Sequence, residues 1–280
     1  MFQNSLCILI AACLLLSCTP KPKAKTPGIV VLSPEVAEII CALGAEDQIT
    51  GLSSECDYPA SLSAKPKVGN FSTIDKEAII ALNPQIVFCS ALEQEGIAAE
   101  LKKLGMQVEI VYPKSIATML QEIVRIGGLI GKEEQAEKLT ADYRIALQQI
   151  MATNSKNQRP KVYLEIYRDP LMSVSDASLV GELIDAAGGD NIFPTLERDY
   201  ARVNPEAVIS AKPDIMICFS RDSRPNICAR KGWQNIPAVV SRRIYFETDI
   251  NPDIIQRATP RSIEGIRQMQ ALFSAWASTQ

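Results

Sequence analysis

The sequence predicts an α/β protein of two doubly wound α/β lobes joined by a single long helix, with a ligand cleft between the lobes. Three observations lead to this prediction. Apolar runs of strand length alternate with helical patterns along most of the 280 residues. Two phrases of sequence each occur twice, in the same order. Between the two copies, residues 132–152 carry the apolar stripe of a long amphipathic helix.

The repeats relate the two halves of the chain. VAEIICALGAED at 36–47 matches VGELIDAAGGDN at 180–191, and EAIIALNPQIV at 77–87 matches EAVISAKPDIM at 206–216. Because only two copies occur, the pattern favours two related lobes over a solenoid. The predicted division is a lipoprotein signal peptide at 1–17, a lipidated cysteine and tether at 18–28, an N-terminal lobe at 29–131, the linking helix at 132–152 and a C-terminal lobe at 153–280.

The first residues are interpreted as an export signal. The apolar stretch from Leu6 to Leu16 is short for a membrane span, and Leu15-Leu16-Ser17-Cys18 resembles a bacterial lipobox, in which the cysteine is lipidated. The alternative is an ordinary signal or anchor helix that ends in an incidental cysteine. We expect a protein held by Cys18 on the periplasmic or extracytoplasmic face of a bacterial membrane, with residues 19–28 as a tether.

The N-terminal lobe alternates strand and helix from its start. Ser33 and Pro34 open a helix that Gly44 ends, since serine caps helices, proline suits the first turn and glycine suits the position after the last turn. The remaining pattern predicts strands at 29–32, 48–52, 86–89 and 108–111, and helices at 75–82, 97–104 and 116–129. This order is typical of a small doubly wound parallel sheet.

The linking helix has its apolar residues at steps of three and four: Ala136, Leu139, Tyr143, Leu147 and Ile150. Two glutamates in its first turn suit the helix dipole. At about 1.5 Å per residue the helix is roughly 30 Å long, which is enough to reach from one lobe to the other.

The C-terminal lobe shows the same alternation of strands and helices, but less regularly. The pattern predicts strands at 162–166, 215–219 and 244–246, and helices at 179–187, 205–211 and 260–276. We expect a loop at 220–238, where arginine, proline, asparagine and glycine are scattered.

Composition excludes several kinds of function. The chain has no histidine, which removes Ser-His-Asp and Cys-His catalysis, histidine-based zinc sites and a histidine-ligated haem. The net charge is −3 without a basic stripe, which argues against a nucleic acid partner. We expect a monomeric, non-enzymatic protein that holds no resident cofactor or metal.

Five cysteines follow Cys18 without a CxxC spacing: Cys41, Cys56, Cys89, Cys218 and Cys228. Cys89 and Cys218 each fall five residues after the proline of the second repeated phrase, at equivalent strand ends. Two soft ligands facing a cleft could bind a metal. Small buried hydrophobes are the commoner fate of such cysteines, and we favour that interpretation.

Several side chains are candidates for a ligand site. Ligands of open α/β sheets bind beyond the carboxyl ends of the strands, so Ser90 and Tyr167 should line the cleft. Phe71 and Tyr200 each lie six residues before a glutamate of the repeat. Aromatic residues in loops can belong to a satellite core, but the matching offset favours cleft walls that stack on a large, flat ligand.

Two charged pairs are also candidates. Asp253 and Arg257 have an i,i+4 spacing, so they either pair on a helix surface or present hydrogen bonds to a ligand. Glu77 and Glu206 open equivalent helices, each seven residues before a proline. They are either first-turn acids that face the helix dipole or a symmetric docking pair for arginines on a partner.

These residues together resemble the helical-backbone class of substrate-binding proteins of ABC importers. The resemblance rests on Asp57-Tyr58-Pro59, on the phrases that begin at Glu77 and Glu206, on AGGDNIF at 187–193 and on RATPR at 257–261. It covers almost all of the chain beyond the tether. Within the class it is nearest to the cobalamin binders, and ferric-siderophore and haem binders are near relatives.

The resemblance implies that two lobes trap a chelate between them and that Glu77 and Glu206 dock onto arginines of a permease. It also implies that Asp253 and Arg257 contact the ligand.

By the same resemblance, Phe71 and Tyr200 fall where the cobalamin binders carry tryptophans. Glu55 and Ser90 replace aromatic residues found there.

The expected function is therefore a substrate-binding lipoprotein that captures a corrinoid and delivers it to an ABC permease. A ferric siderophore or haem is the alternative cargo. An exported enzyme or metallochaperone on a related fold is the less favoured class, because the chain lacks histidine and any nucleophile–base constellation.

Overall fold

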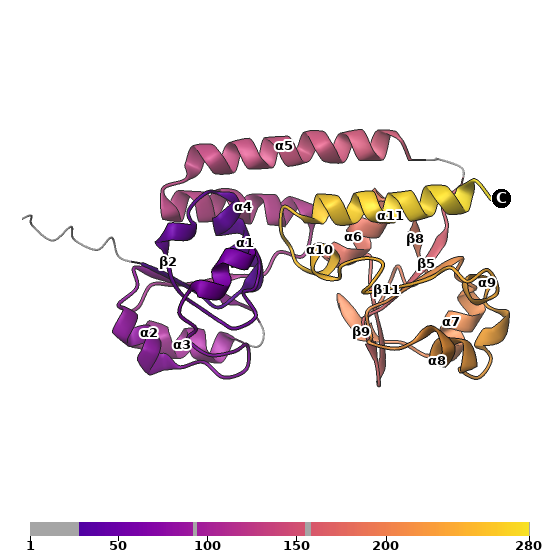
Figure 1. The fold of residues 1–280 in the computed structure, drawn as a ribbon, viewed down its shortest axis with the longest axis horizontal. Coiled ribbons are helices and arrows are strands. Elements are labelled where there is room, and N and C mark those ends of the chain that lie inside the picture. The colour runs from indigo at the N-terminus through magenta and orange to yellow at the C-terminus, as the bar shows by residue number, and fades with distance from the viewer. Residues whose placement is uncertain (1–27, 92–93, 155–157, 280) are drawn as a thin grey trace, which may run out of the picture.

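A computed structural model describes residues 28–91, 94–154 and 158–279. The predicted signal peptide, Cys18 and all of the predicted tether except Gly28 lie outside the described residues. Two separate four-stranded parallel sheets form the centres of two α/β lobes, and a small three-stranded sheet belongs to the second lobe (Figure 1). The predicted fold class is confirmed.

The N-terminal lobe has the strand order β2-β1-β3-β4, with all neighbours parallel. Its strands are β1 (Ile29–Val31), β2 (Ile49–Leu52), β3 (Ile86–Ser90) and β4 (Val108–Val111). Its helices are α1 (Pro34–Ala42), α2 (Lys76–Leu82), α3 (Glu95–Lys103) and α4 (Ile116–Ile130), with 3-10 turns at Glu46–Gln48 and Ala60–Ala64.

Local chemistry explains where these helices begin and end. The Ser33 hydroxyl accepts a hydrogen bond from the backbone N–H of Val36, and Pro34 occupies the first turn of α1. Ser115 and Thr118 form a reciprocal capping box at the start of α4. Gly131 ends α4 with a φ of +70°, a conformation that glycine adopts at no steric cost.

The C-terminal lobe has the strand order β11-β10-β5-β8, again parallel, and an antiparallel sheet of order β6-β7-β9. Its strands are β5 (Lys161–Glu165), β6 (Tyr167–Arg168), β7 (Leu171–Val174), β8 (Asp190–Asn191), β9 (Tyr200–Arg202), β10 (Ile215–Cys218) and β11 (Ile244–Phe246). Its helices are α6 (Leu179–Ala186), α7 (Pro205–Ala211), α8 (Arg224–Ala229), α9 (Pro237–Val240), α10 (Asp253–Gln256) and α11 (Ser262–Ala277), with a 3-10 turn at Trp233–Asn235.

The prediction of a loop at 220–238 is wrong. The segment contains α8, the 3-10 turn and the start of α9. Ser223 caps α8 through the backbone N–H of Asn226, and Ile227, Trp233 and Ile236 are buried in one apolar cluster. Each helical piece is too short to show a repeating apolar pattern, so the turn-forming residues between the pieces dominated the prediction.

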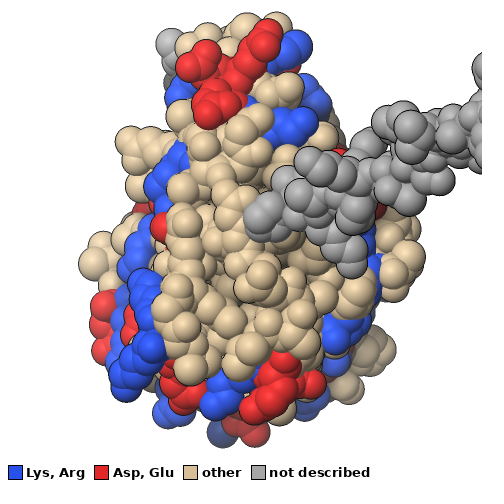
Figure 2. Space-filling model, turned by 90° about the vertical axis from the view of Figure 1, so that its left-hand side faces the viewer, with Lys and Arg blue, Asp and Glu red and all other residues tan. Residues whose placement is uncertain are grey.

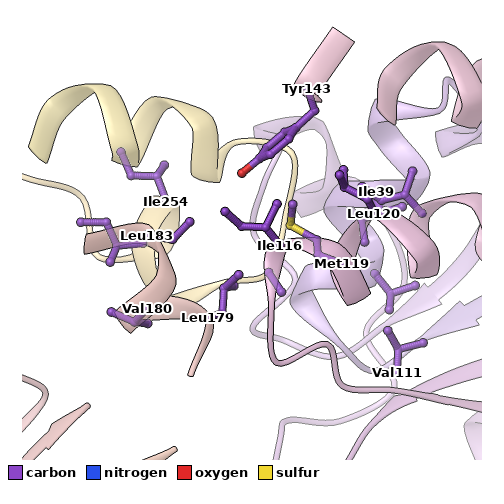
Figure 3. Close-up of a cluster of buried hydrophobic side chains, with 14 of the residues drawn as sticks. Ile39, Val111, Ile116, Met119, Leu120, Tyr143, Leu179, Val180, Leu183 and Ile254 are labelled. Carbon is purple, nitrogen blue, oxygen red and sulfur yellow. The ribbon is translucent and has the colours of Figure 1, made fainter. Parts of the chain in front are cut away.

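One layer of long helices spans both lobes. Helix α5 (Glu133–Ala152) runs along the top of the molecule, with α4 beneath one half of it and α11 beneath the other (Figure 1). A buried apolar cluster continues under this layer from one lobe to the other (Figure 3). In it Ile116 and Met119 of α4 lie near Tyr143 of α5 and face Leu179 and Leu183 of α6.

Within residues 28–91, 94–154 and 158–279, no helix is both long enough and apolar enough to cross a bilayer. Figure 2 shows the face at the N-terminal lobe's end, where uncharged residues fill the centre and acidic and basic side chains are interspersed around the rim.

Candidate functional site

The strand orders give each lobe one point at which the direction of winding reverses. In the N-terminal lobe this switch lies between β1 and β3, and in the C-terminal lobe it lies between β5 and β10. Ligands of open α/β sheets bind at the carboxyl edge at such points. A ligand site is therefore expected at the strand ends at Ser90 and Glu165.

A pocket of about 40 Å³ lies between the two lobes. The N-terminal lobe lines it with Glu35, Ser90, Val111, Tyr112, Pro113 and Lys114, and the C-terminal lobe lines it with Ser178, Leu179, Asp199, Tyr200, Gln256 and Ala258. The pocket is thus built from the carboxyl edge of the first sheet, the start of α6 and the strand β9.

Side-chain hydrogen bonds fix the wall of the pocket that the N-terminal lobe provides. The Ser33 hydroxyl donates to the Glu35 carboxylate at 2.7 Å. Gln94, which is buried, accepts from the backbone N–H of Ser90 at 2.8 Å and donates to the carbonyl of Leu32 at 3.1 Å. Gln94 therefore joins the ends of β1 and β3 and fixes the position of Ser90 at the switch point.

The opposite wall presents Tyr200. Burial raises the pKa of its phenol above the ordinary value of 10, so the phenol is neutral at physiological pH. Asp199, which precedes Tyr200 in the sequence, forms an ion pair of 3.0 Å with Lys114 of the other wall. This ion pair joins the two walls. The Lys114 ammonium also lies 5.6 Å from the centre of the Tyr112 ring.

The C-terminal switch point is filled by the protein's own charges. The Glu165 carboxylate at the end of β5 is fully buried and accepts from Arg230 at 2.6 and 2.8 Å and from the Ser220 hydroxyl at 2.5 Å. Arg230 also donates to Asp222 at 2.8 Å and lies over the Trp233 ring. A buried carboxylate needs such partners, and this network holds the segment after β10 against β5.

The structure brings some of the predicted ligand residues together and keeps others apart. Tyr200 and Ser90 line the same pocket from opposite lobes. Phe71 is half-buried in the turn that precedes α2 and does not line the pocket. Tyr167 is on β6 with 56% of its surface exposed, and it also lies outside the pocket lining.

The predicted pair of Asp253 and Arg257 is also outside the pocket lining, although Gln256 and Ala258 belong to it. The Arg257 guanidinium lies 3.2 Å from the Asp253 carboxylate. It also donates to Glu38 at 3.0 Å and to Asp57 at 2.8 Å, both in the N-terminal lobe. Arg257 is thus engaged by three carboxylates.

The predicted docking glutamates occupy equivalent places in the two lobes. Glu77 and Glu206 are exposed in the first turns of α2 and α7, which Asp75 and Asn204 cap. Both helices lie on the side of the molecule away from α5 (Figure 1). A surface pocket of about 600 Å³ lies beside Glu206.

The cysteines of the described residues are all free thiols. Cys89 and Cys218 are completely buried, which confirms the favoured interpretation of the pair. Burial raises the pKa of Cys89 to about 12 and that of Cys56 to about 11. Among the described residues, no three acidic or thiol side chains are grouped so that they could hold a metal ion.

Sequence reasoning missed Tyr112 and Lys114 of the pocket lining. Tyr112 directly follows the predicted strand 108–111, so the rule that selected Ser90 would have selected it too. The partner of Lys114 could not be found in this way, because Asp199 is far away in the sequence.

Comparison with known proteins places the chain among transport-related binding proteins. Residues 29–249 match the model of a family described as periplasmic binding protein. An uncharacterized ABC transporter substrate-binding lipoprotein of Bacillus subtilis, YvrC, is 27% identical over 88% of this chain and 80% of its own length. A vitamin B12-binding protein of Vibrio cholerae is 26% identical over 94% of this chain and 96% of its own length.

Solved structures share the fold. The periplasmic heme-binding protein RhuT from Roseiflexus sp. RS-1, in its apo form, superposes with a TM-score of 0.79 at 23% identity. The match covers 90% of this chain and 99% of the other. At this level of sequence identity, the similarity supports a shared fold and nothing further.

Proposed function

The chain belongs to the periplasmic binding protein family, and from this premise we propose that it is the substrate-binding protein of an ABC importer, with a corrinoid as its cargo. In this proposal it captures the corrinoid outside the cytoplasm and delivers it to the permease. Cys18 is the proposed lipid anchor, and Glu77 and Glu206 are the proposed permease contacts.

One observation carries the proposal. A pocket lies between two α/β lobes, at the carboxyl edge of the first sheet, and Tyr112 and Tyr200 line it from opposite lobes. Aromatic rings on facing walls suit a large, flat ligand, because ring faces bury apolar area and stack. The name of the Vibrio cholerae relative, a vitamin B12-binding protein, favours a corrinoid among such ligands.

A second cargo class is supported by the oxygen donors of the pocket. The chain has no histidine, and the phenols of Tyr112 and Tyr200 supply hard oxygen atoms, which suit ferric iron. Haem or a ferric siderophore is therefore the alternative cargo.

The pocket must enlarge when such a ligand binds. Its volume of about 40 Å³ is well below the roughly 300–1,000 Å³ of ordinary ligand pockets. The Lys114–Asp199 ion pair joins its two walls and both residues are partly exposed, so opening this pair would free the side chains nearest the mouth. We propose that the pair opens and that Tyr112 and Tyr200 then contact the ring system.

The experiment is a calorimetric titration of the purified protein with cyanocobalamin, with hemin and with a ferric siderophore, together with absorbance spectra of each mixture. We expect one cyanocobalamin bound per chain. Tight binding of hemin or of the siderophore without cyanocobalamin binding would replace the corrinoid with the alternative cargo. Binding of none of the three would contradict the proposal that the cargo is a metal chelate of this kind.

A further inference from the structure

One buried carboxylate joins the two lobes at a place that the pocket does not use. Glu38 lies in α1 with 4% of its surface exposed. Arg261, at the start of α11, donates from Nε to Glu38 Oε2 at 2.7 Å and from Nη2 to Glu38 Oε1 at 3.2 Å. Arg257 adds a hydrogen bond from Nη1 to Glu38 Oε1 at 3.0 Å. Two arginines of the C-terminal lobe thus converge on one acid of the N-terminal lobe.

Neighbouring groups complete the cluster from both sides. Asp57, in the loop after β2, accepts from Arg257 at 2.8 Å, and Asp253 of α10 lies 3.2 Å from the same guanidinium. The Arg261 guanidinium lies 3.5 Å from the centre of the Tyr58 ring. Glu38, Asp57 and Tyr58 belong to one lobe, and the other three residues belong to the other lobe.

Separating the lobes at this cluster would be costly. Glu38 would lose both of its arginine partners, and breaking a buried ion pair is strongly unfavourable. Most of the other arginine pairs stay within one lobe: Arg159 bonds Asp185 and Asp190, and Arg230 bonds Glu165 and Asp222. The Glu38 cluster therefore acts on the relation between the lobes.

We infer that Glu38, Arg257 and Arg261 form a clamp that holds the two lobes at one spacing, both before and after a ligand binds. Glu35 lines the pocket one turn before Glu38 in α1, and Gln256 and Ala258 line it on either side of Arg257. The clamp residues are thus close in sequence to residues that line the pocket from both lobes. In this inference Arg257 is a positioning residue. The pocket then has to enlarge through movements of side chains and loops, while the distance between the lobes stays unchanged.

The test measures the distance between the lobes. Spin labels are attached to keto amino acids introduced at Ile80 in α2 and Val240 in α9, which are 46% and 67% exposed and lie in different lobes. This chemistry leaves the native thiols unmodified. Distance distributions are recorded by double electron–electron resonance without ligand, with cyanocobalamin and with hemin.

We expect one narrow distribution for the parent protein that ligand does not shift. Glu38→Gln and Arg261→Ala should each broaden it toward longer distances and raise the ligand dissociation rate about tenfold or more. Arg159→Ala is the matched control, since it removes an arginine with two carboxylate partners inside one lobe and should leave the distribution unchanged.

Two results would overturn the clamp. One is an unchanged distance distribution in variants that circular dichroism shows to be folded. If Glu38→Gln does not fold, Arg261→Ala provides the test, because Arg261 is partly exposed. The other is a clear shift in the parent when ligand binds. The inference rests on the proposed function only where it concerns the ligand-bound protein. If neither cyanocobalamin nor hemin binds, the distance distributions of the ligand-free parent and variants still decide whether the clamp exists.

Discussion

The Glu182 carboxylate of α6 accepts a 2.6 Å hydrogen bond from the backbone N–H of Ile116, the first residue of α4. A glutamate of the C-terminal lobe therefore satisfies a helix start of the N-terminal lobe. The first N–H groups of a helix have no partner within the helix, and a carboxylate there also suits the helix dipole. The contact belongs to the same interlobe region as the apolar cluster under α5 (Figure 3).

Glu182→Ala should lower the free energy of unfolding by about 0.5–2 kcal/mol, the usual effect of losing a helix cap. Glu182→Gln should cost less, because its amide oxygen can still accept the hydrogen bond. Urea unfolding followed by circular dichroism measures both. Glu133→Ala, which removes an exposed first-turn acid of α5, is the control. Equal small losses for Glu182→Ala and Glu133→Ala would show that the interlobe hydrogen bond adds no stability.

The repeat and the alternation of elements were enough to predict the two-lobe architecture. Both depend on local patterns: strands such as 108–111 and the helix 205–211 have the predicted bounds, because apolar periodicity and helix caps specify them. The small sheet β6-β7-β9 was not predicted. Its strands are only two to four residues long. β6 and β7 form a short hairpin, and β9 joins β7 from later in the sequence.

The site was predictable only in part, because contacts between residues far apart in the sequence leave no local pattern. Ser90 could be placed because the carboxyl end of a parallel strand has a defined position. Asp253 and Arg257 were recognised as a pair, but their i,i+4 spacing holds no information about Glu38, which is more than 200 residues away in the sequence. The roles of long, charged side chains depend on such partners.

Tyr200→Ala should weaken ligand binding by about 1–3 kcal/mol, because a stacked ring in a pocket is a typical binding hot spot. Tyr200→Phe separates the two cargo classes. A stacked corrinoid should tolerate the loss of the hydroxyl, whereas a ferric ligand bound through the phenol should not. Calorimetric titration measures both variants. An unchanged affinity for Tyr200→Ala would remove this residue from the site.

Phe71→Ala is predicted to weaken corrinoid binding by a similar amount, about 1–3 kcal/mol. The ring is half-buried in the turn before α2 and outside the lining of the ligand-free pocket. It can contact the ligand only if the bound state extends beyond that pocket. Normal affinity in this variant, with Tyr200→Ala impaired, would confine the ligand to the region near Tyr200.

The thiols should differ sharply in reactivity. Cys56, Cys89 and Cys218 are buried, and burial raises the pKa of each, so little thiolate is present and little reagent can reach it. We expect these three to stay unlabelled in the folded protein at pH 8 and to react after denaturation, while the half-buried Cys228 reacts first. Peptide mass spectrometry after timed labelling identifies each site. Rapid labelling of Cys89 and Cys218 in the ligand-free protein would contradict their burial.

Asp222 should make stability depend on pH. Burial alone would raise the pKa of its carboxyl, but hydrogen bonds from Arg230 and Asn226 outweigh this and hold the pKa below the ordinary value of 3.8. Since the pKa is lower in the folded than in the unfolded state, the stabilisation is complete above the unfolded pKa. It is lost as the pH falls from about 4 through the lowered pKa.

Asp222→Asn tests this dependence. It should reduce the free energy of unfolding by about 1–3 kcal/mol at neutral pH, as expected for hydrogen bonds to a charged group. The difference from the parent should shrink as the pH falls below about 4. Urea unfolding at a series of pH values measures it, with the exposed Asp47→Asn as control. A difference that stays constant with pH would mean that the charge of Asp222 does not contribute.

The last prediction separates transport from ligand binding. Glu77 and Glu206 are exposed at equivalent helix starts on the side of the molecule away from α5 (Figure 1). Neither lines the pocket between the lobes. Glu77→Ala and Glu206→Ala should therefore leave ligand affinity unchanged and reduce uptake, with each contact worth about 2–5 kcal/mol if it is buried against an arginine of the permease. Charge reversal at both positions should reduce uptake further.

Glu133→Lys is the matched control for these variants, since Glu133 is also an exposed first-turn acid but lies on α5. It should leave uptake normal. Loss of an exposed first-turn glutamate should cost only about 0.3–1 kcal/mol of stability, so all of these proteins should remain folded. Transport is measured with the permease reconstituted in proteoliposomes. Uptake at the parental rate with both glutamates reversed would show that these residues only face the helix dipole, and docking would then have to use another surface.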